Sequence, residues 1–276
     1  MPRFDSRLGC STISFRHQPL PEALSTIAGL GFSEIDLGAL PGVCDHVPYV
    51  LDADAVTSVA ADVRASGLTV RSINADVGDL NEPLDQPARH ARSHHLEMLV
   101  ALAVATGSRA VVLPCGALNR EPLQTLDVDL DLVAAELTAA ADLAADDGVE
   151  LWTESLHFHR LCCNLERAER LSERLTDTPV RQVMDFSHVV ASGGDPAEFV
   201  DHLGAHIAHV HIRDAVPGNI NLSVGNGDVD FARGLKTLRH ADYAGHFSLE
   251  LETRDLTNDQ RPAATARAAR FISPLI

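Results

Sequence analysis

Short apolar segments alternate with longer amphipathic segments along nearly the whole chain. Each apolar segment is short enough for a buried strand, and several of them follow a turn that contains glycine. A run of this kind repeated through one chain is typical of strands that are separated by helices. We predict strands at Leu8–Ser14, Glu34–Gly38, Thr69–Ala75, Arg109–Gly116, Val149–Leu156, Arg181–His188, Ile207–Asp214 and His246–Thr253.

The segments between these strands repeat apolar residues three and four positions apart, which is the period of an amphipathic helix. Asn164 and Asp195 stand where N-caps are expected, and glycines such as Gly67 and Gly107 stand where a left-handed residue would end a helix. We predict helices at Pro21–Ala28, Ala53–Ser66, His90–Thr106, Leu130–Ala145, Leu165–Leu175 and Pro196–Leu203.

This alternation predicts the fold class. Strands that alternate with helices pair in parallel and are joined by right-handed crossovers. Eight such units in 276 residues match an α/β TIM barrel of the (β/α)8 type, which typically has about 250 residues. An open, doubly wound sheet is the less favoured alternative. No linker or low-complexity segment divides the chain, so we expect one barrel domain over residues 1–276.

Composition and charge narrow the function. Hydrophobic residues make up 45% of the chain, which supplies a large core. The formal charge is −17, with 39 acidic against 22 basic residues and no cluster of lysine or arginine, so a nucleic-acid partner is excluded. No apolar stretch approaches the roughly 20 residues of a membrane span, and no signal-like start is present. We expect a cytoplasmic protein, and a homo-oligomer stays open.

The five cysteines have no CxxC spacing, which argues against a structural zinc site or a disulfide framework. The informative ligands lie elsewhere, at the carboxyl ends of the last four predicted strands. Those ends form the active-site face of a TIM barrel, yet they carry ionisable residues where buried parallel strands should be apolar. The segments are Trp152-Thr-Glu154, Met184-Asp185-Phe-Ser-His188, His209-Val-His211-Ile-Arg213-Asp214 and Ser248-Leu-Glu250-Leu-Glu252.

Carboxylates and an imidazole that converge in this way suit one divalent metal ion, such as Mn, Mg, Co or Zn. Without a cation, the converging carboxylates would repel one another and some would have to take up a proton. A single glutamate at a strand end is more often an ordinary surface carboxylate, and a single histidine on an apolar strand is more often a core residue. Their joint occurrence on consecutive strands is what favours a metal site.

Four motifs then connect the chain to a known family. They are Asp185-Phe-Ser-His188, His209-Val-His211-Ile-Arg213-Asp214, Gly225-Asn-Gly227-Asp228-Val-Asp230-Phe231 and Gly245-His-Phe-Ser-Leu-Glu250. With them, the sequence resembles the xylose-isomerase-like TIM barrels, the sugar phosphate isomerase/epimerase superfamily. The resemblance covers nearly the whole chain, from the Gly9–Ser14 segment onward. The motifs are fairly specific for the superfamily but do not fix a substrate.

The resemblance implies a set of site residues. Glu252 has the same strand parity as Glu250 and stays open as the alternative ligand. His188 is implied as a substrate contact or an extra ligand. From the chemistry of the site, we expect Arg213 to orient substrate oxygens together with His188. The implied metal ligands are Glu154, Asp185, His211 and Glu250, of which Glu154 and Glu250 are also the candidate catalytic proton carriers.

Three further features of the sequence lie near this site. His157 lies in the loop directly after Glu154 and is a candidate substrate contact, with a surface role as the equal alternative. We expect Asp214 to hold Arg213 in place. The segment Gly225–Gly227 is a weak phosphate-loop signal, because Asp228 and Asp230 would cap the amides that a phosphate needs.

Departures from the family pattern argue against a DNA-repair nuclease and weaken the case for a ketose 3-epimerase. The superfamily's DNA-repair nucleases hold three zinc ions with extra histidines. This chain has Leu113-Pro-Cys-Gly116 in place of their His-Pro-Gly-like strand end, and residues 215–231 contain no histidine. Ketose 3-epimerases place an arginine a few residues beyond the histidine ligand, where this chain has Ala215-Val-Pro-Gly218. The epimerase substrate contacts are therefore in doubt.

The leading hypothesis is a metal-dependent isomerase or epimerase of a sugar, polyol or small hydroxy-keto acid. It would remove a proton next to a carbonyl through a metal-stabilised enediolate. The alternative enzyme is a dehydratase of the inosose or dehydroshikimate type, which would begin with the same step and then lose a hydroxyl group. A non-catalytic barrel that binds a metabolite or a partner subunit is the hypothesis from another class.

Overall fold

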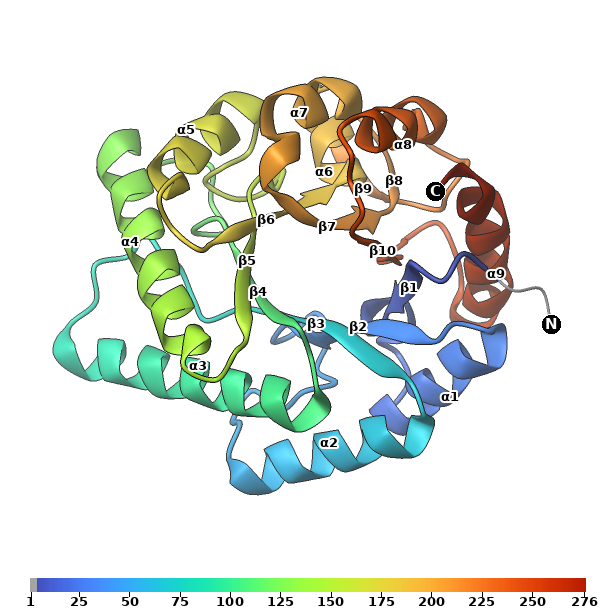
Figure 1. Ribbon diagram of the computed structural model, residues 1–276, viewed down its shortest axis with the longest axis horizontal. Coiled ribbons are helices and arrows are strands. Elements are labelled where there is room, and N and C mark those ends of the chain that lie inside the picture. Colours follow the sequence, from blue (N-terminus) through green and yellow to red (C-terminus); the bar gives the residue numbers. More distant parts are fainter. Residues whose placement is uncertain (1–3) are drawn as a thin grey trace.

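The computed structural model describes residues 4–276 and shows eight parallel strands in a closed barrel surrounded by helices (Figure 1). The strands follow one another around the barrel in the order β1, β10, β7, β6, β5, β4, β3 and β2. The TIM-barrel prediction is confirmed. The barrel strands are β1 (Leu8–Ser11), β2 (Glu34–Ala39), β3 (Thr69–Ala75), β4 (Ala110–Pro114), β5 (Glu150–Glu154), β6 (Arg181–Asp185), β7 (Ile207–Ile212) and β10 (His246–Leu249).

Helices connect these strands and form the outer layer, as the amphipathic pattern predicts. Short 3₁₀ turns at Thr12–Phe15, Gly204–His206, Asn258–Gln260 and Ser273–Leu275 complete the described elements. The helices are α1 (Leu20–Leu30), α2 (Ala53–Ser66), α3 (Gln86–Thr106), α4 (Leu126–Ala145), α5 (Leu165–Leu175), α6 (Phe186–Ala191), α7 (Pro196–Leu203), α8 (Phe231–His240) and α9 (Arg261–Ile272).

Local capping chemistry explains many of the helix boundaries. Asn164 and Asp195 accept hydrogen bonds from the first turns of α5 and α7, as expected from the sequence. Gly67 and Gly107 end α2 and α3 with φ of 73° and 69°, a left-handed conformation that glycine adopts without a steric cost. These helix ends deliver the chain back to the amino-terminal ends of the strands.

Several predicted strands are too long at their carboxyl ends. The segment Arg181–His188 is a strand only as far as Asp185, because the Asp185 carboxylate accepts the amide hydrogens of Ser187 and His188 and starts α6. The segment Ile207–Asp214 likewise ends as a strand at Ile212. Beyond it, β8 (Asp214–Val216) and β9 (Asn219–Leu222) form an antiparallel hairpin that the apolar pattern did not predict.

The strands have an apolar outer face and an unusually polar inner face. Residues such as Ile35, Val111 and Val210 point outward and pack with the helices in the main hydrophobic core. The inward alternates form only a small apolar cluster, of Ala110, Val112, Trp152 and Val183. The rest of the interior includes buried polar side chains, among them Asp36, Ser72 and His209. The barrel therefore carries titratable groups below the site as well as at its mouth.

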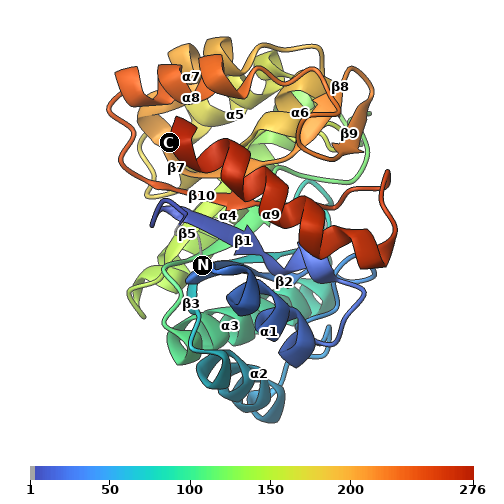
Figure 2. The same cartoon turned by 90° about the vertical axis from the view of Figure 1, so that its right-hand side faces the viewer.

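The C-terminal helix α9 closes the ring of helices. It runs along the side of the barrel where β1 meets β10, and it packs beside α1 (Figure 2). This placement brings the first and last barrel strands under one helix. Within residues 4–276, the helices are too short or too polar to cross a membrane.

Candidate metal centre and active site

The four implied metal ligands meet at the mouth of the barrel. Their donor atoms all lie within 4.8 Å of one another, and all four side chains are buried. His211 Nδ1 lies 3.4 Å from Glu250 Oε2 and 3.8 Å from Glu154 Oε1. Parallel strands end at the same edge of the barrel, which brings the four residues together. Glu154 and Asp185 are the last residues of β5 and β6, Glu250 directly follows β10, and His211 lies on β7.

The donor set and its hydrogen bonding fit a divalent cation. Glu154 Oε1 and His211 Nδ1, the two atoms that face the centre, are buried with no hydrogen-bond partner among the residues that the structure describes. A buried polar atom without a partner is costly, so these atoms call for a ligand between them. Three carboxylates and one imidazole are donors that Mn, Mg, Co and Zn accept.

The pKa values of the group show that positive charge is favoured at its centre. Burial, with added repulsion from Asp185 and Glu250, raises the pKa of Glu154 to about 7. Burial disfavours the charged His211 ring, yet the carboxylates of Glu250, Asp36 and Glu154 outweigh burial and hold the pKa of His211 well above its ordinary value. In the protein without an ion, protons thus supply the charge that a metal ion would bring.

The structure places Glu250, not Glu252, in this group. β10 ends at Leu249, so the strand alternation that would give the two glutamates a common direction does not continue through them. Glu252 Oε1 accepts a hydrogen bond of 2.9 Å from Arg16 Nη1, and its Oε2 lies 3.6 Å from Arg213 Nη1. The Glu252 carboxylate is therefore occupied by arginines at the side of the site.

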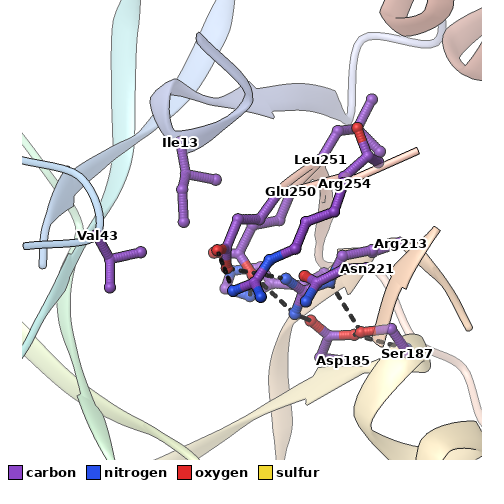
Figure 3. Close-up of polar contacts among 12 residues, drawn as sticks. Ile13, Val43, Asp185, Ser187, Arg213, Asn221, Glu250, Leu251 and Arg254 are labelled. Atoms are coloured by element: carbon purple, nitrogen blue, oxygen red, sulfur yellow. Dashed lines mark hydrogen bonds and ion pairs between the residues drawn. The ribbon is translucent and has the colours of Figure 1, made fainter. Parts of the chain in front are cut away.

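Arg213 lies among the acidic residues, and Figure 3 shows its guanidinium beside Asp185 and Ser187. Nη2 donates to Asp185 Oδ2 at 3.0 Å, and Nε donates to Ser187 Oγ at 2.9 Å. Burial disfavours its charge, but Asp185, Glu250 and Glu252 raise the pKa of Arg213 above its ordinary value. Arg213 is thus a permanent buried cation that fixes a candidate ligand, in addition to lining the cavity.

His188 and His157 pack against one another in the cavity lining, with ring centroids 3.8 Å apart and ring planes inclined by 34°. The Phe158 amide donates to His188 Nδ1 at 3.1 Å, so the neutral ring carries its proton on Nε2, which lies 3.8 Å from Glu154 Oε1. Burial and nearby positive groups hold the pKa of each ring well below its ordinary value. Both rings are therefore neutral, and His188 presents an N–H group to the site.

A cavity of about 290 Å³ lies over this centre, close to the lower size limit of small-molecule pockets. Polar side chains from many loops line it, and Ile13, Val43 and Leu118 add apolar contacts. In Figure 3, Ile13 and Val43 face the arginines and carboxylates across this space. The sequence-predicted residues that line the cavity are Glu154, His157, His188, Arg213, Glu250 and the alternative ligand Glu252.

Comparison with known proteins decides the family. The family model described as a xylose isomerase-like TIM barrel matches residues 24–275. The chain belongs to this family. Among curated relatives, inosose dehydratase from Geobacillus thermodenitrificans is 22% identical over 274 residues, which cover 89% of this chain and 89% of that protein.

Solved structures share the fold of this xylose isomerase-like barrel at low sequence identity. The 3-keto-D-glucoside 4-epimerase YcjR from E. coli superposes with a TM-score of 0.76 at 20% identity, over 96% of this chain and 99% of that one. The IOLI protein with a bound zinc atom superposes with a TM-score of 0.77 at 18% identity, over 98% of this chain and 99% of that one.

Two polar residues near the centre of this xylose isomerase-like barrel were not predicted from the sequence. Asn74, near the end of β3, donates from Nδ2 to Glu250 Oε1 at 2.9 Å. Asp36 lies within β2, between Ile35 and Leu37. A charged residue between two apolar residues of a strand was the feature of the sequence that could have indicated a buried functional group. Burial would raise the pKa of the Asp36 carboxyl, but His209 and His211 hold it well below its ordinary value.

The expectation that Asp214 holds Arg213 is wrong. Both Asp214 oxygens accept backbone amide hydrogens instead, from Ala215, Gly225, Gly227 and Val229. Asp214 therefore folds the loop after β9 back onto the barrel. The same hydrogen bonds occupy the amides of Gly225 and Gly227, so this glycine segment shapes the loop and does not present those amides to a phosphate.

Proposed function

We propose that this protein is a divalent-metal-dependent isomerase or epimerase of a sugar, a polyol or a small hydroxy-keto acid. The observation that carries the proposal is the buried group of Glu154, Asp185, His211 and Glu250, of which Glu154 and Glu250 line the cavity. Its partnerless donor atoms also favour a metal enzyme over a barrel that only binds a metabolite, because a binding scaffold gains nothing from such costly groups.

A divalent cation at this centre would supply Lewis-acid polarisation of a substrate carbonyl, which makes the neighbouring C–H group acidic. Glu154 and Glu250 would accept and return the proton. They flank the centre, since β6 and β7 separate β5, which ends at Glu154, from β10, which Glu250 directly follows. Proton transfer on opposite faces of one carbon gives epimerisation, and transfer between neighbouring carbons gives aldose–ketose isomerisation.

The two glutamates differ in how firmly they are held. Glu250 Oε1 accepts a hydrogen bond from Asn74, and Glu250 Oε2 lies 3.4 Å from His211 Nδ1 and 3.7 Å from Arg213 Nη2. Within residues 4–276, Glu154 Oε1 accepts no hydrogen bond, and His188 and His211 each lie 3.8 Å from it. We therefore assign the first proton removal to Glu154, whose carboxylate has more freedom to move toward a substrate.

His188 would orient the substrate. Its Nε2 lies 3.1 Å from Arg213 Nη2, and both groups carry hydrogens, so neither accepts from the other. A substrate oxygen in the cavity within hydrogen-bond distance of both nitrogens would accept from both. His157 would support the His188 ring by stacking and would line the cavity wall.

The charge of the lining supports an uncharged substrate. Four carboxylates line the cavity, and Asp185 of the ligand group adds a fifth negative charge. Three arginines oppose them. The lining carboxylates are those of Asp76, Glu154, Glu250 and Glu252, and the arginines are Arg160, Arg213 and Arg254. A divalent ion would balance this deficit of two positive charges. A neutral sugar or polyol then meets complementary surroundings, whereas a phosphorylated sugar would bring two further negative charges.

Hydrogen exchange tests the proposal directly. Elemental analysis should find one divalent ion per chain, and metal-loaded protein should exchange a carbon-bound hydrogen of at least one neutral ketose in deuterium oxide. Glu154→Gln should abolish this exchange. The matched control is Glu150→Gln, which changes the same residue type at the other end of β5 and should exchange like the parent. Protein without stoichiometric metal, or equal exchange by Glu154→Gln, contradicts the proposal.

A metal-dependent dehydratase is the second candidate, because the similarity to inosose dehydratase spans 89% of each protein. Such an enzyme would begin with the same proton removal by Glu154. It would then release a hydroxyl group as water and leave a conjugated product. Absorbance in the ultraviolet that grows with substrate turnover identifies this reaction, and exchange without new absorbance identifies the isomerase or epimerase.

A further inference from the structure

A second titratable cluster lies inside the barrel beneath the proposed metal ligands. Its centre is Asp36 of β2, which is fully buried. Asp36 Oδ2 lies 2.8 Å from His209 Nε2 and 3.4 Å from His211 Nε2, and Oδ1 accepts a 2.8 Å hydrogen bond from Ser72 Oγ. Strands β1 and β10 separate β2 from β7, so these contacts cross the barrel interior.

The His211 ring lies between this cluster and the proposed metal centre. Nδ1 faces Glu250 Oε2 at 3.4 Å and Glu154 Oε1 at 3.8 Å, while Nε2 faces Asp36 Oδ2. A histidine binds a metal through a nitrogen that carries no hydrogen, and its other nitrogen commonly donates to a carboxylate. The ring orientation in this structure matches that arrangement, with Nδ1 facing the centre and Nε2 facing Asp36 Oδ2.

His209 completes the cluster from the same strand. It lies two residues before His211, its Nε2 shares Asp36 Oδ2 with His211, and its ring packs against Trp152 with centroids 5.5 Å apart. The rings of His209 and His211 meet edge to face at 5.2 Å. Asp36 is thus held by Ser72 and His209, and it cannot turn away from His211 without losing both hydrogen bonds.

We propose that Asp36 is a positioning residue for His211: by accepting the Nε2 hydrogen, it keeps Nδ1 free and aimed at the metal. This inference rests on the proposed metal site and extends it to residues that touch neither the metal nor the substrate. A purely structural role for Asp36, as one more buried polar group of the barrel, would affect folding but would not select a tautomer of His211.

Substitution of Asp36 tests the inference through metal affinity. Asp36→Asn preserves the shape of the side chain and removes its charge, and we expect it to weaken Zn²⁺ or Mn²⁺ binding about 10- to 100-fold in competition with a chelator. Ser72→Ala is the matched control, because it removes the hydrogen bond to Oδ1 and leaves the carboxylate beside His211. Its metal affinity should stay within about threefold of the parent. A folded Asp36→Asn protein with parental metal affinity overturns the inference.

The His211 tautomer gives a second readout that needs no variant at Asp36. Nitrogen NMR of histidine-labelled, Zn²⁺-loaded parent protein, with His211→Gln to assign the signals, should show metal bound to Nδ1 of His211 and hydrogen on Nε2. Metal bound to Nε2 overturns the inference even if Asp36→Asn does not fold. A parent protein that binds no metal overturns the proposed function as well, whereas a parent that binds metal with an unaffected Asp36→Asn variant overturns only the role of Asp36.

Discussion

Arg213 donates a hydrogen bond of 3.0 Å from Nη2 to Oδ2 of Asp185, so a permanent cation holds one of the proposed metal ligands. Both side chains are buried, and Arg213 also lies 3.7 Å from Glu250 Oε2 and 3.6 Å from Glu252 Oε2. A buried ion pair adds little net stability compared with apolar residues, but losing one partner is strongly destabilising. The stability of the barrel mouth therefore depends on the charge balance between Arg213 and the carboxylates of the metal centre.

We expect Arg213→Gln to destabilise the metal-free protein by about 3–5 kcal/mol, because Asp185 and its neighbours lose their compensating charge. The loss should be smaller with metal bound, since the ion then supplies positive charge to the same carboxylates. Urea unfolding with a chelator and with saturating Zn²⁺ measures both values. The control is Arg254→Gln, an exposed arginine of the same cavity, which should change stability by less than about 0.5 kcal/mol. Equal losses with and without metal would refute this coupling.

The raised pKa of Glu154 predicts a pH-dependent stability of the metal-free protein. The folded protein holds this proton up to about pH 7, whereas the unfolded chain releases it near the ordinary value of 4.5. Between these values the folded state binds more protons, so the free energy of unfolding falls as pH rises, by at most roughly 3 kcal/mol in total. Above this window the loss is complete and stability no longer changes through Glu154.

Glu154→Gln removes this contribution, while the carboxylates of Glu250 and Asp36 still raise the pKa of His211 in the variant. Unfolding in chelator from about pH 5 to about pH 8 should show the variant gaining stability relative to the parent as pH rises. Saturating metal should reverse that order above neutral pH, since only the parent carboxylate binds the ion strongly. A stability difference that stays constant across this range would show that Glu154 does not titrate there.

His188 is a test between a substrate contact and an extra metal ligand. Its Nε2 lies 3.8 Å from Glu154, and Glu154, His157 and His188 also come close enough to hold an ion. Arg213, 3.1 Å from the same nitrogen, disfavours a cation at that place. We expect His188→Gln to lower kcat/KM about 10- to 100-fold through a lost substrate hydrogen bond and to leave metal affinity within about threefold. A large loss of metal affinity would identify His188 as a ligand.

The barrel and the place of the proposed metal centre could be predicted from the sequence because both depend on local patterns, while the four named ligands came from the family motifs. The alternation of strand and helix patterns along the chain predicts the topology. Parallel strands bring their carboxyl ends together regardless of the conformation of the loops. Glu154 and Asp185 therefore meet His211 without any knowledge of side-chain packing. Glu250 could be placed only through its motif, since it lies one residue beyond β10, where alternation no longer applies.

The supporting residues could not be predicted, because their roles depend on contacts across the barrel or between loops. Asp36 and His209 lie 173 residues apart in the sequence and meet only when the barrel closes. Asp214 follows Arg213 directly, which suggested an ion pair between them. In the structure, the loop after β9 folds back, and its backbone amides donate to the Asp214 carboxylate instead. Such competition is decided by loop geometry, which has no periodic signal.

The choice between Glu250 and Glu252 is the sharpest test of the proposed centre, because the two residues have the same chemistry on one segment. Glu250 shares the ligand group with His211, whereas Glu252 is paired with Arg16 and Arg213. We expect Glu250→Gln to weaken metal binding at least about 100-fold, as loss of a ligand charge does, and Glu252→Gln to weaken it by less than about fivefold. Chelator competition measures both, and circular dichroism verifies that each variant is folded. If Glu252→Gln proves the more damaging change, the ligand set must be redrawn around Glu252, and Arg213 must move to release it.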